Sequence, residues 1–251
     1  MLRETLVFGP IFSRRLGSSL GINLLPERGK LCNFDCIYCE CGWNKDGRTD
    51  EQLPDTQALR SALEAKLSAC AASGQKIDSI TFSGDGEPTL NPCFPEIIDV
   101  TLELRGKYYP SSVVSVLTNA TRLHDDRVFA ALRKVDAPIL KLDAPTTELA
   151  SIINRPQRRY DVEEVVAGME RFGSDFTLQT MFLRSPSFDS LSPEVLLPWM
   201  GLVRRLRPRE IMAYTIARPS PQEGLEKVTA PEMRAALEPL ITDGYNIKIY
   251  E

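Results

Sequence analysis

The stretch Leu31–Trp43 reads LCNFDCIYCECGW and places Cys32, Cys36 and Cys39 in a C-x3-C-x2-C spacing. Three thiolates can ligate three irons of a [4Fe–4S] cluster. No further cysteine follows at the spacing of a ferredoxin, so one iron would stay open to a ligand that is not protein. An open iron can act chemically on what it binds, whereas a fully cysteine-ligated cluster mostly carries electrons. The spacing therefore favours a reactive cluster.

A zinc site is the alternative for these cysteines. Zinc takes four ligands, usually as two close pairs, and this loop offers a single set of three. Cys41 lies only two residues past Cys39 and is a poor fourth ligand. Cys70 falls on an apolar helix stripe, where packing is the expected role, and the role of Cys93 stays open. An iron–sulfur cluster is therefore favoured over zinc.

Length and composition limit the class of protein. The 251 residues are 43% hydrophobic, which suits one domain over 1–251 with the cluster loop at 30–43. Six cysteines, three of them in one loop, do not form a disulfide framework, so a reducing cytoplasm is expected. The N-terminus has no apolar signal segment. The sequence also contains no run of about 18 apolar residues, so neither a signal peptide nor a membrane span is expected. The net charge of −4 leaves room only for a local basic patch.

Apolar periodicity predicts alternating strands and helices. Strands are expected at Leu20–Leu25, Ile77–Ser83, Val113–Thr118, Ile139–Asp143, Phe176–Leu183, Glu210–Ile216 and Asn246–Tyr250. Helices are expected at 56–73, after Pro95, at 126–134, from Asp161 to Gly173, from Ser192 and after Thr229. Asp55 is a candidate cap, and the pairs Asp161 with Glu164 and Thr229 with Glu232 look like capping boxes. About six β/α units predict a parallel sheet with helices outside, in a partial (β/α)6 barrel.

Polar side chains alternate along one face of several of these strands, although buried parallel strands are usually apolar on both faces. The pairs and triplets are Ser79, Thr81 and Ser83; Ser115 and Asn119; Lys141 and Asp143; Thr177 and Gln179. Lys141 under a packed helix would be an uncompensated buried charge, so we expect it to point into the barrel. Ligands of parallel α/β folds lie beyond the carboxyl ends of the strands. A polar ligand site is expected there.

The run Thr81–Pro88 (TFSGDGEP) follows the second predicted strand. Glycines let backbone carbonyls and amides approach a ligand closely, and Glu87 offers a carboxylate to an ammonium group. Alone, the run reads equally well as an ordinary glycine-rich β/α turn. Beside the cysteine loop, it becomes a candidate cofactor site.

The cysteine loop, with the aromatic Tyr38 before its last ligand, resembles the cluster loop of the radical S-adenosylmethionine (SAM) superfamily. In that family the open iron binds the amino and carboxylate groups of SAM, and an electron from the cluster breaks a C–S bond to give a 5′-deoxyadenosyl radical. The resemblance implies a radical SAM enzyme with a partial TIM-like barrel. It also implies that SAM is held by residues at the strand ends: Tyr38, Gly84, Asp85, Gly86 and Glu87, and then Asn119, Lys141, Asp143 and Gln179.

Two segments, GPIFSRRLGSSLGINLLP (9–26) and LDAPTTELASIINRP (142–156), resemble the wyosine-type tRNA synthase branch of that superfamily. The sequence departs from the branch because no cysteine precedes Cys32, so the ligands of its second cluster are missing. A flavodoxin-like domain is also absent. The resemblance implies a nucleobase, nucleotide or RNA substrate and an external electron donor of the flavodoxin or ferredoxin type, but not synthesis of the tricyclic base.

Other functions stay open from the sequence. A radical enzyme of this kind could instead modify a peptide, a protein or a small metabolite, including activation of a partner by a glycyl radical. An electron carrier or a zinc module is the non-enzyme alternative, but neither needs polar strand ends. The arginines at 155, 158 and 159 and at 204–209 are either solvated faces or a phosphate-binding surface. His124 is the single histidine, so a histidine acid–base mechanism has little support.

Overall fold

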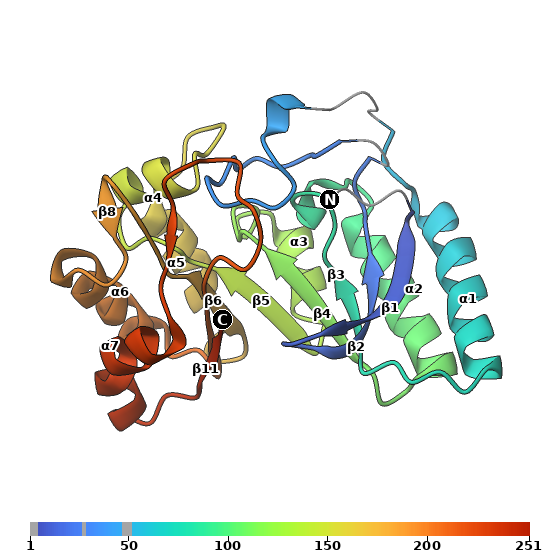
Figure 1. The fold of residues 1–251 in the computed structure, drawn as a ribbon. Coiled ribbons are helices and arrows are strands. Elements are labelled where there is room, and N and C mark those ends of the chain that lie inside the picture. The colour runs from blue at the N-terminus through green and yellow to red at the C-terminus, as the bar shows by residue number, and fades with distance from the viewer. Residues whose placement is uncertain (1–4, 27–28, 47–51) are drawn as a thin grey trace. The chain divides into compact units, whose positions relative to one another are not determined.

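The computed structural model describes residues 5–26, 29–46 and 52–251. The chain divides into two compact units, which Figure 1 draws as ribbons. The first unit comprises Met1–Cys32, Asn44–Thr118 and Arg122–Pro138, and the second comprises Asn33–Trp43, Asn119–Thr121 and Ile139–Glu251. Each unit alternates strands and helices, as the sequence predicts. That the whole chain acts as one domain stays a prediction.

Four strands form the sheet of the first unit: β1 (Val7–Ser13), β2 (Gly17–Ile22), β3 (Ser79–Phe82) and β4 (Val113–Thr118). β1 and β2 pair antiparallel, and β2, β3 and β4 pair in parallel in that order. The sequence did not predict β1. The β2 strand also begins earlier than predicted, at Gly17.

Hydroxyl side chains cover one buried face of these strands. Ser79 Oγ lies 2.9 Å from Thr81 Oγ1 and 3.1 Å from Ser115 Oγ. Thr81 Oγ1 is in turn 2.8 Å from Ser19 Oγ. All four residues are buried. The polar face expected from the sequence therefore exists, and its hydroxyls satisfy one another, which lowers the cost of burying them.

The helices of the first unit are α1 (Thr56–Ala72), α2 (Phe94–Tyr108) and α3 (Asp126–Leu132), with short 3-10 turns η1 (Asn44–Asp46) and η2 (Pro88–Leu90). α2 contacts both α1 and α3. The Asp55 carboxylate caps α1 by accepting from Ala58 N at 2.8 Å. Leu59, Leu63, Leu67 and Cys70 are buried on one stripe of that helix. The predicted helix, its cap and the packing role of Cys70 are confirmed.

The second unit has a parallel sheet in the order β5 (Ala137–Lys141), β6 (Thr177–Met181), β9 (Glu210–Tyr214) and β11 (Ile247–Tyr250). A small antiparallel sheet places β7 (Leu183–Ser185) between β8 (Phe188–Asp189) and β10 (Glu226–Lys227). Lys141 pairs in register with Gln179, and Gln179 with Met212. Side chains in register project from the same face of a sheet, so the polar residues of β5 and β6 lie on one face.

The helices of the second unit are α4 (Thr147–Ile153), α5 (Val162–Glu170), α6 (Pro193–Leu206) and α7 (Ala230–Thr242). The capping box of α7 is present, with Thr229 and Glu232 bonded to each other's backbone. The box predicted for α5 is wrong. Asp161 caps that helix alone, because the Glu164 carboxylate pairs with Arg159 at 2.7 Å. The sequence did not predict α4.

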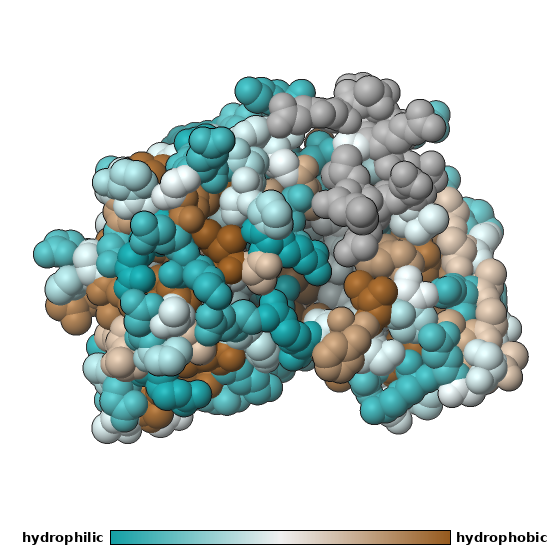
Figure 2. Space-filling model, in the orientation of Figure 1, coloured by the Kyte–Doolittle hydropathy of each residue, from teal (hydrophilic) through white to brown (hydrophobic). Residues whose placement is uncertain are grey.

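Large hydrophobic side chains are exposed at a few scattered positions, among them Phe12 at 84% and Leu197 at 63%. Figure 2 shows hydrophobic residues interspersed with hydrophilic ones on the visible face of each unit. Singly exposed apolar side chains are common on protein surfaces, so these positions indicate no particular function. Among the helices of the described ranges, none combines the length and apolar character needed to cross a membrane.

Candidate cofactor site

The glycine-rich turn after β3 is bonded to the residue that precedes the first cysteine. Leu31 N donates to Asp85 O at 3.0 Å, and Leu31 O accepts from Glu87 N at 3.0 Å. The two bonds make a parallel bridge between Leu31 and Gly86 inside the first unit. The bridge holds the glycine-rich turn against Leu31, the residue directly before Cys32.

Both glycines of the turn are required by close packing. An added Cβ at Gly86 would lie 1.8 Å from Leu31 O, and one at Gly84 would lie 2.0 Å from Asn23 Oδ1. Gly86 also has φ +142°, which L side chains rarely adopt. Asn23 holds the turn from both sides, since its Oδ1 accepts from Asp85 N at 3.2 Å and its Nδ2 donates to Asp85 Oδ2 at 3.3 Å. The sequence did not single out Asn23.

Glu87 is buried at 2% exposure and is bonded within the first unit. Its Oε1 accepts from Thr89 N at 3.1 Å, from Thr89 Oγ1 at 2.6 Å and from Thr118 Oγ1 at 2.7 Å. The carboxylate therefore caps η2 and ties the end of β4 to the turn. One of its oxygens has a structural role that the sequence did not indicate.

The part of the cysteine loop that belongs to the second unit, Asn33–Trp43, is held by the last residue of α4 and the residues after it. Asp35 N and Ile37 N donate to the carbonyl oxygens of Asn154 and Ile153 at 2.9 and 3.0 Å. Next to them, Phe34 forms an antiparallel bridge with residue 156, and Gln157 N donates to Asn33 O at 2.9 Å. We call this arrangement of 33–37 against 153–157 the loop clamp. It explains how a loop without regular structure keeps a defined shape.

The thiols sit in different environments. Cys36 is buried, whereas Cys32 and Cys39 are half-buried. Burial raises the pKa of the Cys36 thiol to about 11, and the nearby Lys141 ammonium opposes that rise. Cys39 N donates to Cys36 O at 3.1 Å, which makes a tight turn between these two residues.

The donor set fits a [4Fe–4S] cluster by its chemistry. The protein ligands of such a cluster are cysteine thiolates, each bound to a different iron. Three thiols within eight residues, with no imidazole among them, are the ligand type that such a cluster takes.

A charged network lies around Lys141, at the end of β5 in the second unit. Lys141 Nζ donates to the hydroxyls of Tyr38 and Tyr214, each at 2.9 Å, and lies 3.8 Å from Asp143 Oδ2. Burial alone would lower the pKa of Lys141, but Asp143 and Tyr214 raise it above its usual range, so the ammonium stays charged. The sequence analysis expected a ligand to pair with the Lys141 ammonium, but this ammonium already has protein partners. Nothing in the sequence pointed to Tyr214 as one of them.

Asp143 is the centre of that network. Its Oδ2 accepts from the Tyr38 hydroxyl and from Asn154 Nδ2, the latter at 2.7 Å, and its Oδ1 accepts from Met181 N at 2.9 Å. Burial and then the Asp143 charge raise the pKa of Tyr38 well above its usual value, so the phenol stays protonated and donates. Asn154 Nδ2 also lies 3.4 Å from Cys36 Sγ.

Asn119 and Gln179, two further candidates, differ in their surroundings. Asn119 Nδ2 donates to Asn33 Oδ1 at 2.7 Å, directly after the first cysteine, and its Oδ1 accepts from Thr121. Gln179 is 4% exposed, and within the described residues its Nε2 has no hydrogen-bond partner. Buried amides are nearly always bonded, so Gln179 is the candidate with capacity left for a ligand.

Arg155 of the loop clamp, and Arg158 and Arg159 just after it, have different surroundings. The Arg155 guanidinium stacks over the Trp43 ring at 4.9 Å and donates to Gln222 Oε1 at 2.6 Å. Arg159 pairs with Glu164, and Arg158 is exposed. Arg155 therefore has a structural role in holding Trp43, in addition to any role in binding phosphate.

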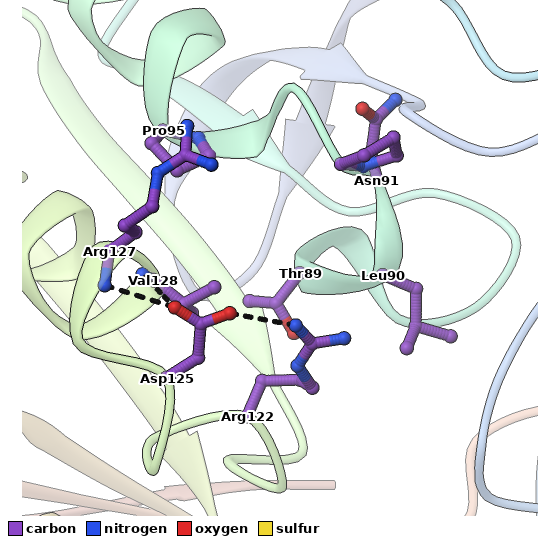
Figure 3. A pocket seen from close by; sticks show the side chains of 9 residues that line it. Thr89, Leu90, Asn91, Pro95, Arg122, Asp125, Arg127 and Val128 are labelled. Atoms are coloured by element: carbon purple, nitrogen blue, oxygen red, sulfur yellow. Dashed lines mark hydrogen bonds and ion pairs between the residues drawn. The ribbon is translucent and has the colours of Figure 1, made fainter.

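A recess opens beside η2 in the first unit, and Figure 3 shows its lining. Arg122 points toward Asp125 and pairs with it at 2.8 Å, and Asp125 Oδ1 also accepts from Arg127 N at 3.0 Å. Arg127 in turn pairs with Glu96. Because these charges are paired within the protein, the recess is a weaker candidate for cofactor binding than the strand ends.

Comparison with known proteins shows what the chain resembles. A UPF0026 protein of Synechocystis sp. is 32% identical over 221 residues, which cover 86% of this chain and 77% of that protein. The chain spans between 33% and 77% of the length of the curated relatives it matches.

Solved structures show the same fold. A radical SAM methyltransferase from Sphaerobacter thermophilus superposes with a TM-score of 0.71 at 16% identity, covering 96% of this chain and 67% of that one. SuiB of Streptococcus suis, solved with S-adenosylmethionine bound, gives a TM-score of 0.66 at 14% identity over 92% of this chain and 50% of SuiB. These likenesses confirm the predicted fold class, a mixed α/β partial barrel of the radical SAM type. The radical SAM superfamily profile matches residues 27–191, well over half of the sequence, and the chain therefore belongs to the radical SAM superfamily.

Proposed function

We propose that the chain is an enzyme that holds a [4Fe–4S] cluster through Cys32, Cys36 and Cys39 and uses it to cleave S-adenosylmethionine. The observation that carries the proposal is the C-x3-C-x2-C loop, which lies inside the family match and is held by the loop clamp. When bound, the cluster would supply the one electron for reductive cleavage of SAM, and the 5′-deoxyadenosyl radical that this releases would abstract hydrogen from a substrate. The protein's part is to bind, orient and exclude water.

SAM is proposed to bind at the polar strand ends. Backbone carbonyls of Gly84, Asp85 and Gly86 are proposed for its amino group, with Glu87 as the anionic partner. Asn119, Lys141, Asp143 and Gln179 are proposed for its carboxylate and ribose, and Tyr38 is a further proposed contact of SAM. Among the described residues nothing accepts a hydrogen bond from Gln179 Nε2, which supports the assignment of Gln179 more strongly than that of Asp143, whose oxygens already accept from protein donors.

The proposed substrate is a nucleobase or nucleotide, free or within RNA. Support comes from the two segments that resemble the wyosine-type branch and from the arginines beside the loop clamp. We propose a flavodoxin- or ferredoxin-type protein as the one-electron donor. We also propose a reducing, cytoplasmic setting, because all six cysteines are free thiols.

Anaerobic reconstitution tests the enzyme assignment. Protein loaded with iron and sulfide and reduced with dithionite should convert SAM to 5′-deoxyadenosine and methionine, slowly without a substrate. The matched control is protein with Cys36→Ala, treated identically. Equal amounts of 5′-deoxyadenosine from both would reject the proposal. Candidate RNA, peptides and metabolites labelled with deuterium would then identify the substrate, since only a true substrate transfers deuterium to 5′-deoxyadenosine.

A further inference from the structure

We propose that Asn154 is a positioning residue that donates a hydrogen bond to the Cys36 sulfur and so raises the reduction potential of the cluster. The inference rests on the proposed function, because it assigns a control element to the same site. Its basis is the contact of Asn154 Nδ2 with Cys36 Sγ at 3.4 Å, made by residues 118 positions apart in the sequence.

The neighbouring carboxylate decides which end of the Asn154 amide faces the sulfur. Asp143 Oδ2 lies 2.7 Å from the same amide nitrogen. An ionised carboxylate only accepts hydrogen bonds, so the amide end that it contacts must be the NH2 group. That group has two hydrogens, one for Asp143 and one for Cys36. The sulfur therefore receives a donor and not the amide oxygen.

Asp143 itself cannot turn freely. Its other oxygen, Oδ1, accepts from Met181 N in β6, and its Oδ2 also accepts from the Tyr38 hydroxyl. The side chains of Asp143 and Asn154 are buried, and the Asn154 backbone carbonyl belongs to the loop clamp. The β6 backbone thus holds the Asp143 carboxylate, and the carboxylate holds the Asn154 amide. Because both side chains are buried, protein contacts and not solvent orient the amide N–H toward the Cys36 sulfur.

A fixed N–H dipole with its positive end at a sulfur ligand favours the form of the cluster that carries more negative charge. Hydrogen bonds to the sulfurs are among the factors that set the potential of iron–sulfur clusters, together with net charge and solvent exposure. One-electron reduction adds negative charge. Removal of the donor should therefore make the cluster harder to reduce, with the three cysteine ligands unchanged.

The test compares midpoint potentials of reconstituted proteins in a redox titration followed by electron paramagnetic resonance. Asn154→Leu removes the donor at nearly constant volume, and Asn154→Ser removes it with a shorter side chain if leucine impairs folding. We expect the equilibrium constant for reduction to fall about three- to tenfold, a shift of about 30–60 mV to more negative potential for a one-electron couple.

Controls separate this effect from general destabilisation. Asn91→Leu replaces another amide that is 2% exposed and bonded to two backbone carbonyls, Leu24 O and Pro54 O, and it should leave the potential unchanged. Asn154→His keeps a ring N–H of similar reach and should recover part of the shift.

The possible results distinguish the two proposals. A wild-type protein that binds no cluster rejects the proposed function. A wild type with a full cluster, and an Asn154 variant with the same iron content and the same midpoint potential, overturns the role of Asn154 and leaves the enzyme assignment intact. A shift of equal size in Asn91→Leu would also overturn it, because the effect would then be general.

Discussion

Leu31 and Gly86 pair through their backbones, with both flanking hydrogen bonds at 3.0 Å. The bridge joins the glycine-rich turn to the residue before Cys32 and leaves no space for a side chain at position 86. The turn that the sequence offers as a candidate cofactor site, or as an ordinary glycine-rich β/α turn, is therefore tightly packed within the first unit.

Gly86→Ala should break this bridge. The new Cβ would lie 1.8 Å from Leu31 O on a backbone with φ +142°, so the turn must move or the protein must lose stability. We expect a loss of more than about 2 kcal/mol in the free energy of unfolding, measured with urea. Gly201→Ala, in α6 with nothing near its Cβ, should instead stabilise by about 0.5–1 kcal/mol. Equal effects of the two substitutions would contradict the bridge.

Glu87→Ala should lower both stability and SAM affinity. Three donors from Thr89 and Thr118 would lose their buried acceptor, which should cost about 2–4 kcal/mol in the free energy of unfolding. Removing the anionic partner of the SAM ammonium should weaken binding about ten- to a hundredfold. Glu194→Ala, on the exposed first turn of α6, should change stability by less than about 0.5 kcal/mol. Reduced stability with unchanged SAM affinity would assign Glu87 to the turn alone.

Alanine at each of the three cysteines should abolish the cluster. Reconstituted wild type should bind close to four irons with a brown absorption that air removes, whereas Cys32→Ala, Cys36→Ala and Cys39→Ala should not. Cys70→Ala is the matched control, because that buried thiol lies on α1 and donates to Gln75 Oε1 at 3.3 Å. The iron content of each reconstituted variant is measured. A cysteine variant that still binds as much iron as the wild type would show that this cysteine is not a ligand.

Tyr38 and Lys141 should be energetically coupled. Tyr38→Phe removes a hydroxyl that donates to Asp143 and accepts from Lys141, and should cost about 1–2 kcal/mol in unfolding free energy. A double-mutant cycle with Lys141→Met should give a coupling energy of about 1 kcal/mol or more. The comparison cycle pairs Lys141→Met with Tyr109→Phe, whose hydroxyl donates to Gln75 O. Additivity in both cycles would mean that the network contributes no joint stability.

RNA binding, if RNA is the substrate, should weaken steeply with salt. The exposed side chain of Arg158 and its neighbours Arg155 and Arg159 are the expected phosphate-binding groups. Each alanine substitution that removes one arginine–phosphate pair should flatten the log–log slope of affinity against salt by about 0.7–0.9. Arg205→Ala should leave the slope unchanged, because that guanidinium is paired with Glu163 and Glu170. An affinity that does not respond to salt, or no binding near ~50 mM salt, would favour a small-molecule or peptide substrate.

Local signals in the sequence predicted local structure well. Asp55 caps α1, and Thr229 with Glu232 forms the capping box of α7, because each motif bonds only to residues of its own first turn. The same pattern at Asp161 failed since Arg159, just before the helix, competes for the Glu164 carboxylate. The helix α4 was not predicted, although Thr146 caps it with a side chain that accepts from Leu149 N.

The arrangement of the candidate site depends on contacts between residues far apart in the sequence, which local sequence patterns do not predict. Lys141 was predicted to need a partner for its charge. The Asp143 carboxylate is nearby in the sequence, but the two hydroxyls to which Lys141 donates, those of Tyr38 and Tyr214, lie 103 and 73 residues away. The sequence analysis gave Asn154 no role of its own, although it lies in the segment 142–156 that resembles the wyosine-type branch. Side-chain alternation predicts the face on which a residue lies, whereas the identity of its partner depends on how distant strands and loops are brought together.

The loop clamp also sets an order of events in biosynthesis. Cys32, Cys36 and Cys39 are synthesised before residues 153–157, which shape their loop. The carboxylate that orients Asn154 is anchored later still, on Met181 of β6. During translation the thiols are therefore present for more than a hundred residues before their surroundings exist. If the proposed cluster is inserted into the folded loop, its insertion follows synthesis of residues 153–181, and the cysteines must stay reduced until then.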